Sequence, residues 1–148
     1  MTSFPITKIT ASLTETEEFG AFIGKTLLEN GQNDAFIAMY GDLGAGKTAF
    51  VRGLASVVTP GAHVCSPTYT VVNEYYGDSR RLCHFDMYRI ESEEDLYSIG
   101  FYDYENCMIA AEWCEKTPFA FPQRYIKLVI EKLGEEKRRI TLTEVENT

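Results

Sequence analysis

The residues whose types and spacing point most directly to chemistry form the run Gly41-Asp42-Leu43-Gly44-Ala45-Gly46-Lys47-Thr48. Residues 35–40 before it form a short apolar run with the composition of a buried strand, and residues 49–58 after it carry apolar side chains at helical spacing. The pattern G-x-x-x-x-G-K-[ST] between a strand and a helix predicts a loop that binds the phosphates of a nucleotide.

Each residue type in this loop suits a separate task. Gly41, Gly44 and Gly46 allow backbone conformations that are closed to other residues, so backbone N–H groups can approach phosphate oxygens. The following helix directs the positive end of its dipole to the same place. Lys47 supplies a mobile positive charge for the β- and γ-phosphates, and the Thr48 hydroxyl is a natural Mg²⁺ ligand. The alternative is a glycine-rich turn before an ordinary helix.

Two carboxylates follow apolar segments further along the chain. Asp86 ends the run 80–86 and Glu112 ends the run 107–112. A carboxylate at the carboxyl end of a strand faces the crevice where α/β proteins place ligands. An apolar strand that ends in an acid is also what a Walker B element needs to reach Mg²⁺. For Asp86 the alternative is the N-cap of the next helix, although Ser92 offers that helix a better start.

The elements that must position these residues are predicted from periodicity and turn signals. A helix is expected over residues 14–30, with Thr14 or Thr16 as its N-cap. Residues 70–76 and 80–86 are expected to pair as a hairpin, after a hydroxyl-bearing loop that contains Ser66 and Thr68. For Thr68 and Tyr69 the alternative is ordinary loop and strand filler.

The C-terminal part is expected to close the sheet with a second antiparallel hairpin, formed by residues 125–130 and 140–145. Its turn contains Lys137-Arg138-Arg139, which we expect to be solvated; the alternative is that one of these cations contacts ATP. The predicted fold is a P-loop NTPase-type α/β sandwich, a small mixed β-sheet flanked by helices. It occupies a single domain over residues 1–148, with a core at about 12–145.

Composition restricts the partners and the compartment. The net charge of −8 disfavours independent binding of nucleic acid, because phosphate backbones would be repelled. The absence of a long apolar stretch and of a signal-peptide pattern predicts a cytoplasmic protein without a membrane segment. The four cysteines show no metal-ligand spacing and are expected to be free thiols.

Four motifs in this order resemble those of the TsaE family, the bacterial ATPases needed for the threonylcarbamoyladenosine (t6A) modification of tRNA. They are the phosphate loop and three further runs: Ser66-Pro67-Thr68-Tyr69-Thr70, His84-Phe85-Asp86-Met87-Tyr88-Arg89 and Glu112-Trp113. The resemblance covers nearly the whole chain. It implies an Mg²⁺-dependent ATPase that works with the proteins TsaD and TsaB, meets tRNA only indirectly through their complex, and does not bind DNA.

The resemblance also implies roles for individual residues. The phosphate loop from Gly41 to Thr48, with Ala49 and Trp113, would bind ATP; Thr48 and Glu112 would hold Mg²⁺. Lys47, Asp86 and Glu112 would be the catalytic residues, and Ser66, Thr68 and Tyr69 would form a switch segment that responds to the γ-phosphate. The chain departs from the family at Ala49, where a second Thr is frequent, and at Cys114, where Pro or another small residue is common.

Three other functions fit parts of the sequence. A small-molecule or nucleoside kinase on the same phosphate loop would need an acceptor pocket and several arginines on a lid, whereas the arginines here are scattered. A GTPase-like switch would need the N-K-x-D guanine signature, which is missing. A purely structural protein would leave Lys47, Thr48 and Glu112 without a purpose. For the ATPase, weak turnover is expected until partners bind, because no arginine is an obvious finger.

Overall fold

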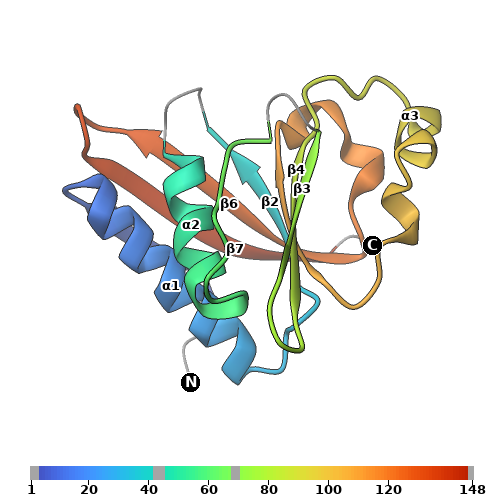
Figure 1. Cartoon of the computed structure of the whole chain (residues 1–148). Coiled ribbons are helices and arrows are strands. Elements are labelled where there is room, and N and C mark those ends of the chain that lie inside the picture. Colours follow the sequence, from blue (N-terminus) through green and yellow to red (C-terminus); the bar gives the residue numbers. More distant parts are fainter. Residues whose placement is uncertain (1–3, 42–45, 68–70, 147–148) are drawn as a thin grey trace.

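The computed structural model describes residues 4–41, 46–67 and 71–146, with the side chain of Lys116 left aside. A seven-stranded sheet runs through these residues in the order β1-β7-β6-β2-β5-β4-β3 (Figure 1). The strands are β1 (Ile6–Thr10), β2 (Phe36–Tyr40), β3 (Val72–Tyr76), β4 (Arg81–Asp86), β5 (Met108–Glu112), β6 (Arg124–Lys132) and β7 (Arg138–Glu146).

The centre of the sheet is parallel and its margins are antiparallel. β2 pairs in parallel with both β5 and β6, and β4 pairs in parallel with β5. β3, β7 and β1 are added by antiparallel pairing. The predicted α/β fold with a small mixed sheet is therefore confirmed. Because β2, β4 and β5 run in the same direction, their carboxyl ends meet at one edge, where Gly41, Asp86 and Glu112 are found.

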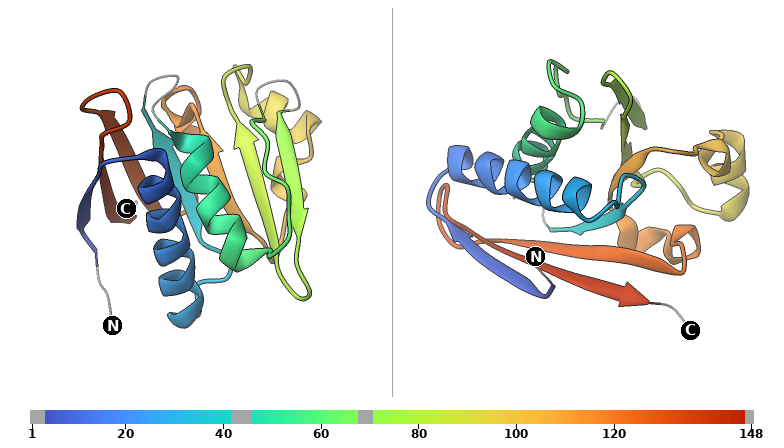
Figure 2. Two further views of the ribbon diagram at one scale, coloured as in Figure 1. Left: turned by 60° about the vertical axis from the view of Figure 1, so that its left-hand side comes forward. Right: turned by 90° about the horizontal axis from the view of Figure 1, so that it is seen from below.

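Two helices, α1 (Leu13–Glu29) and α2 (Lys47–Val58), cover one face of the sheet (Figure 2). Their contact is unusually close at Gly53, where an added Cβ would lie 1.9 Å from the carbonyl oxygen of Glu17. Phe50, Ile23 and Leu54 fill the space between these helices and the sheet and are fully buried. This packing fixes α2, and with it the end of the phosphate loop, against the sheet.

On the opposite face, the β4–β5 side of the sheet packs against shorter elements. These are α3 (Glu93–Ser98) and three 3₁₀ turns, Phe101–Asp103, Cys114–Lys116 and Pro118–Ala120. Phe85 contacts Phe101 edge to face, with 5.1 Å between the ring centres. Both belong to a second hydrophobic core, which lies on this face of the sheet, opposite the core under α1 and α2. Alternate residues of β4 therefore face different layers: Phe85 faces this core, whereas His84 and Asp86 face the α2 side.

Several boundaries differ from the sequence prediction. The N-cap of α1 is Ser12, whose hydroxyl accepts from the backbone N–H of Glu15, so the assignment of the cap to Thr14 or Thr16 is wrong. β1 was not predicted. The two hairpins are confirmed as β3–β4 and β6–β7. Ser92 caps α3 as expected. Within the described residues, no helix has the length and apolar character needed to cross a membrane.

Candidate functional site

Lys47 lies at the centre of the candidate site. It is the first residue of α2 and is only 5% exposed. Its ammonium donates a hydrogen bond to the carbonyl oxygen of Gly41 at 2.8 Å, and Nζ lies 3.7 Å from Oε1 of Glu112. It also lies 4.9 Å from the centre of the Trp113 ring. One cation thus joins the start of the phosphate loop to the end of β5.

The beginning of α2 offers backbone donors beside this cation. Gly46 precedes the helix with φ of 101°, in the left-handed region that favours glycine. The first hydrogen bond of the helix runs from the N–H of Phe50 to the carbonyl of Gly46 at 3.1 Å. The N–H groups of Lys47, Thr48 and Ala49 therefore have no acceptor within the helix, which is the usual arrangement for binding an anion.

The two predicted carboxylates are brought together across adjacent strands. Asp86 and Glu112 are register partners in the β4–β5 pair, and they are 7% and 8% exposed. Burial raises the pKa of the Asp86 carboxyl above its ordinary value of 3.8. The backbone N–H of Tyr88, which donates to Oδ1 at 2.9 Å, opposes this rise in pKa, and the negative charge of Glu112 adds to it.

The structure adds one residue that sequence reasoning missed. His84, on the same face of β4 as Asp86, is fully buried and its Nε2 is hydrogen bonded to Oε2 of Glu112. The signal for it was present in the run His84-Phe85-Asp86, since side chains two residues apart on a strand share a face. The register between β4 and β5, which places the ring beside Glu112, had no sequence signal.

Trp113 stands beside the site with a constrained backbone. Its φ of 61° is in the left-handed region, which is rare for a large side chain. The ring contacts both Lys47 and Tyr88, and Tyr88 meets it edge to face at 5.1 Å between ring centres. Such backbone outliers concentrate at functional sites, where the surrounding packing holds them in place.

Some predicted site residues are outside the described part of the chain. They are Asp42, Leu43, Gly44 and Ala45 of the phosphate loop, and Thr68 and Tyr69 of the expected switch segment. Ser66 is described and is exposed. Thr48 is half-buried in the first turn of α2, and Ala49 is buried. The described residues nearest in sequence to Thr68 and Tyr69 include Val71, whose carbonyl accepts from the N–H of Asp86 at 2.7 Å.

The expectation of a solvated Lys137-Arg138-Arg139 turn is wrong for its middle residue. Lys137 and Arg139 are exposed, whereas Arg138 is 3% exposed and donates from Nη1 to the carbonyls of Gly134 and Lys137. A Cβ placed on Gly46 would lie 3.7 Å from Nε of Arg138. The β6–β7 hairpin reaches the phosphate-loop end of the sheet and brings this guanidinium with it (Figure 1).

The donors at the site suit a hard divalent cation. The described residues contain no group of three or more His, Cys, Asp or Glu side chains that would enclose a metal. They do place the carboxylates of Glu112 and Asp86 side by side at one sheet edge, and Thr48 directly follows Lys47, the partner of Glu112, in the first turn of α2. Mg²⁺ commonly takes one or two protein oxygens and completes its shell with water and substrate phosphates. This donor set therefore fits Mg²⁺ bound together with a nucleotide.

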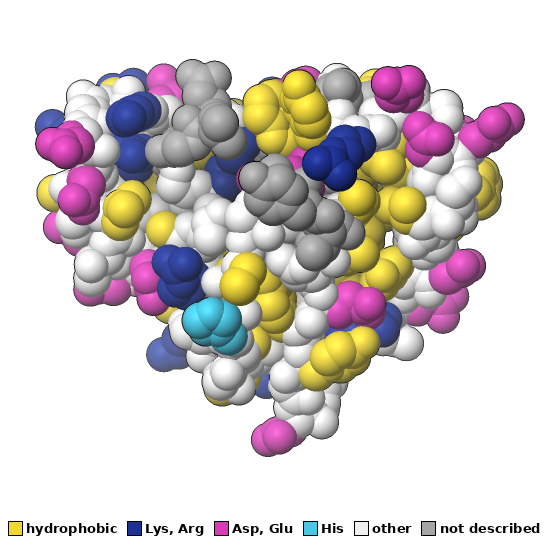
Figure 3. Space-filling model, turned by 45° about the horizontal axis from the view of Figure 1, so that its top comes forward, with side chains coloured by type: hydrophobic (Ala, Val, Ile, Leu, Met, Phe, Trp, Pro, Cys, Tyr) yellow, Lys and Arg dark blue, Asp and Glu magenta, His cyan; other side chains and the backbone are white. Residues whose placement is uncertain are grey.

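Figure 3 shows the end of the molecule where β2 and α2 meet. Lys and Arg side chains lie there beside hydrophobic ones near the centre, and most Asp and Glu side chains lie along the outline. Some of the basic side chains of this acidic chain thus lie at the end of the molecule where anionic phosphates would bind.

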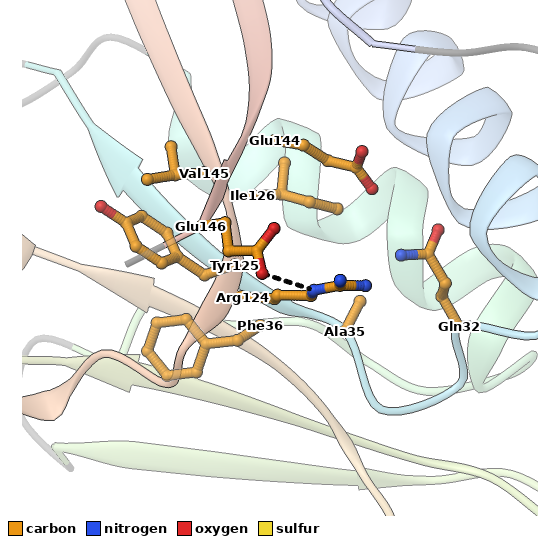
Figure 4. A pocket seen from close by; sticks show the side chains of 9 residues that line it. All are labelled: Gln32, Ala35, Phe36, Arg124, Tyr125, Ile126, Glu144, Val145 and Glu146. Carbon is orange, nitrogen blue, oxygen red and sulfur yellow. Dashed lines mark ion pairs between the residues drawn. The ribbon is translucent and has the colours of Figure 1, made fainter. Parts of the chain in front are cut away.

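A separate cavity of about 450 Å³ lies at the opposite end of the sheet, where β2 and β6 begin (Figure 4). Arg124 and Glu146, which line it, pair with each other at 3.5 Å. None of the residues predicted to act on a nucleotide lines this cavity. It is therefore distinct from the site at Lys47.

Comparison with known proteins gives concordant results. Residues 10–140 match the family model described as "Threonylcarbamoyl adenosine biosynthesis protein TsaE". The chain is 35% identical to the tRNA threonylcarbamoyladenosine biosynthesis protein TsaE of Bacillus subtilis over 75% of this chain and 70% of that protein. It is 32% identical to the protein of the same name from Treponema pallidum, over 90% of this chain and 97% of the relative.

A solved structure also resembles the chain along its length. The crystal structure of Bacillus subtilis YdiB aligns with a TM-score of 0.75 and 26% identity. The alignment covers 98% of this chain and 88% of that one. The likeness therefore includes the sheet edge that carries Lys47, Asp86 and Glu112.

Proposed function

The chain belongs to the TsaE family of threonylcarbamoyl adenosine biosynthesis proteins, and we propose that it binds Mg²⁺ and ATP at its phosphate loop and hydrolyses the ATP. One observation carries the proposal. The ammonium of Lys47 lies between the carbonyl of Gly41 and the carboxylate of Glu112, at the N-terminus of α2. A nucleotide phosphate would offer this buried cation stronger, charged acceptors than a backbone carbonyl.

Binding of the phosphates would rest on three groups of donors. Lys47 gives up its bond to Gly41 and turns its N–H groups to the β- and γ-phosphates. The backbone N–H groups at the start of α2, which have no acceptor within the helix, receive further phosphate oxygens. Arg138 lies beside Gly46 and adds positive charge next to the loop. These donors neutralise the negative charge that develops on the phosphate oxygens while the γ-phosphoryl group is transferred to water.

Thr48 and Glu112 would hold Mg²⁺ directly or through water, as their oxygen donors at the same sheet edge suit this ion. The bound ion would withdraw charge from the β- and γ-phosphates. The Asp86 carboxylate, paired in register with Glu112, would orient a water molecule by accepting its hydrogen bond.

The hydrolysis would support the proteins TsaD and TsaB, which carry out threonylcarbamoyl transfer to tRNA. The net charge of −8 supports an indirect relation to tRNA, because an acidic surface repels nucleic acid unless a partner provides the contacts. We expect slow hydrolysis by the isolated chain and a faster rate in the complex.

Phosphate release tests this function. It is measured with ATP and with GTP, for the chain alone and with TsaD and TsaB added. The proposal predicts Mg²⁺-dependent release from ATP that rises by about tenfold or more with the partners, as expected when a partner completes the electrostatic stabilisation. ATP hydrolysis at the rate of an efficient enzyme without partners, unchanged by their addition, would contradict the partner dependence. Phosphorylation of a nucleoside or metabolite instead of release to water would indicate a kinase.

A further inference from the structure

His84 is buried at a position where an apolar side chain would be expected. It lies on β4 opposite Ala110 of β5, and its neighbours on the same face, Leu82 and Met108, belong to the core under α2. His84 is 0% exposed, and the small side chain of Ala110 leaves room for its ring to reach diagonally toward Glu112. An imidazole in this setting lowers stability unless its ring nitrogens find partners.

The contacts of the His84 ring indicate which of its two nitrogens carries the proton. Nε2 is hydrogen bonded to Oε2 of Glu112, and Nδ1 has no hydrogen-bond partner in the described part of the chain. A proton on Nδ1 would therefore be a buried donor without an acceptor, while Nε2 would face a carboxylate with a bare lone pair. The tautomer that avoids both penalties carries its proton on Nε2 and donates it to Glu112.

This bond determines how the carboxylate of Glu112 is presented. With Oε2 held by His84, the other oxygen, Oε1, faces Lys47 at 3.7 Å. A glutamate side chain has three rotatable bonds, and holding it in one rotamer by packing and a hydrogen bond is a common way to orient a ligand in advance. Because His84 contacts Glu112 from β4 and bonds only Oε2, the oxygen Oε1 stays available on the side of Lys47.

We propose that His84 is a positioning residue, which holds Glu112 so that Oε1 faces the phosphate loop and is ready for Mg²⁺ when nucleotide binds. The proposal rests on the proposed function for the identity of the ion. The ring itself does not contact substrate or metal. The ring restricts the Glu112 side chain to one rotamer before Mg²⁺ and nucleotide bind.

Three substitutions separate positioning from packing. In His84→Gln the amide nitrogen occupies roughly the place of Nε2 and still donates to Glu112, whereas in His84→Asn it is too short to do so. His84→Leu keeps the bulk and removes the donor. His63→Gln is the matched control, since His63 is the other histidine and is exposed.

The measurement is the affinity for ADP with and without Mg²⁺, followed by the fluorescence of Trp113. We expect Mg²⁺ to strengthen binding in the wild type, in H63Q and in H84Q to a similar extent. In H84N and H84L this gain falls by about tenfold, the loss typical when a supporting contact to a metal ligand is removed. Binding without Mg²⁺ stays within about twofold. An unchanged Mg²⁺ gain in H84N, or an equal loss in H84Q and H84N, overturns the proposal.

A second readout is independent of ATP and of Mg²⁺, and its first part needs only the wild-type protein. In wild-type protein labelled with ¹⁵N, ring spectra should show His84 protonated at Nε2, with a shift that changes in Glu112→Gln. Protonation at Nδ1, or a ring signal indifferent to Glu112→Gln, overturns the positioning role. If the wild type shows no Mg²⁺-dependent nucleotide binding, the proposed function fails. The ring spectra would still show whether His84 donates a hydrogen bond from Nε2 to Glu112.

Discussion

Lys47 and Glu112, which are 65 positions apart in the sequence, form a buried ion pair with 3.7 Å between Nζ and Oε1. The pair links the first turn of α2 to the end of β5 across the carboxyl edge of the sheet. Each partner has a second contact: Lys47 donates to Gly41, and Glu112 is bonded to His84. The candidate site is thus arranged as one connected set of polar contacts before any ligand binds.

Lys47→Ala should abolish most nucleotide binding. Loss of a charged hydrogen bond to phosphate costs about 2 kcal/mol, so the Kd for ATP should rise by at least about 30-fold, measured by isothermal titration calorimetry. Lys25→Ala, at an exposed position of α1, is the control and should leave the Kd unchanged. Equal affinities for the two variants would exclude Lys47 from phosphate binding.

Trp113 should report nucleotide binding through its fluorescence. It is the single tryptophan of the chain, and the Lys47 ammonium lies 4.9 Å from its ring. When the ammonium moves to a phosphate, the charge near the indole changes, and the emission should shift or change in intensity. ADP and ATP titrations should give saturable curves in the wild type. If emission is unchanged at nucleotide concentrations that calorimetry shows to be saturating, Lys47 does not leave the ring.

Asp86→Asn should stabilise the fold and remove the activity. Because burial raises the pKa of Asp86 in the folded state, the folded protein holds this proton more tightly than the unfolded chain. The bound proton stabilises the fold at pH values below the pKa that Asp86 has in the unfolded chain. This stabilisation is lost as the pH rises through the higher pKa that Asp86 has in the folded protein. At pH 7.5 the ionised carboxylate is the unfavourable form, so D86N should have the higher Tm.

The difference in Tm between D86N and wild type should shrink near pH 4, where the wild-type carboxyl also gains its proton. Phosphate release at pH 7.5 should fall by about 100-fold, as is typical when a general acid–base group is lost. Thermal melts at both pH values and one rate assay check these effects. A lower Tm for D86N at pH 7.5 would refute the raised pKa.

Gly53→Ala should destabilise the protein although alanine favours helices. Its Cβ would lie 1.9 Å from the carbonyl oxygen of Glu17 and 2.8 Å from the backbone nitrogen of Ala21, so α1 and α2 must separate. Such overpacking costs about 2 kcal/mol, equivalent to a decrease in Tm of about 6 °C for a protein of this size. Gly134→Ala, where the nearest contact of a Cβ is an ordinary 3.6 Å, should change Tm little. Equal Tm values would mean that the helices are further apart than described.

The rate at which each cysteine reacts with a thiol reagent should depend on the solvent exposure of its thiol and not on the thiol pKa. A hydrogen bond from Cys83 lowers the pKa of Cys107 to about 7, but Cys107 is 4% exposed. Cys83 and Cys114 are also buried, whereas Cys65 is exposed. A thiol reagent should therefore label one cysteine quickly in the native protein and all four in denaturant. Cys65→Ser should remove the fast phase; its persistence would show that a buried thiol opens readily.

The sequence was sufficient for the features that depend on local pattern. The strand before the phosphate loop, the helix after it, and the acid-ended strand at Glu112 follow from residue types and periodicity within a few neighbours. The carboxyl ends of parallel strands must share an edge, so the meeting of Asp86 and Glu112 was also predictable.

The features that were missed depend on contacts between distant segments. β1 has a single buried residue, Thr10, and so lacks the apolar alternation of a strand. Ser12, Thr14 and Thr16 all offer a hydroxyl for the cap of α1, and residue type alone does not choose between them; in the structure Ser12 is the cap. The burial of Arg138 requires the hairpin to reach Gly46, which no local pattern encodes.

We propose that Lys47 and Glu112 form the site of a magnesium-dependent ATPase. The decisive measurement is Mg²⁺-dependent phosphate release from ATP by the wild type and by Glu112→Gln, with TsaD and TsaB present. We expect release by the wild type only when Mg²⁺ is added, and a rate about 100-fold lower in E112Q, whose neutral amide is a poor ligand for the ion. Equal rates in the two proteins, or no release by the wild type, would contradict it.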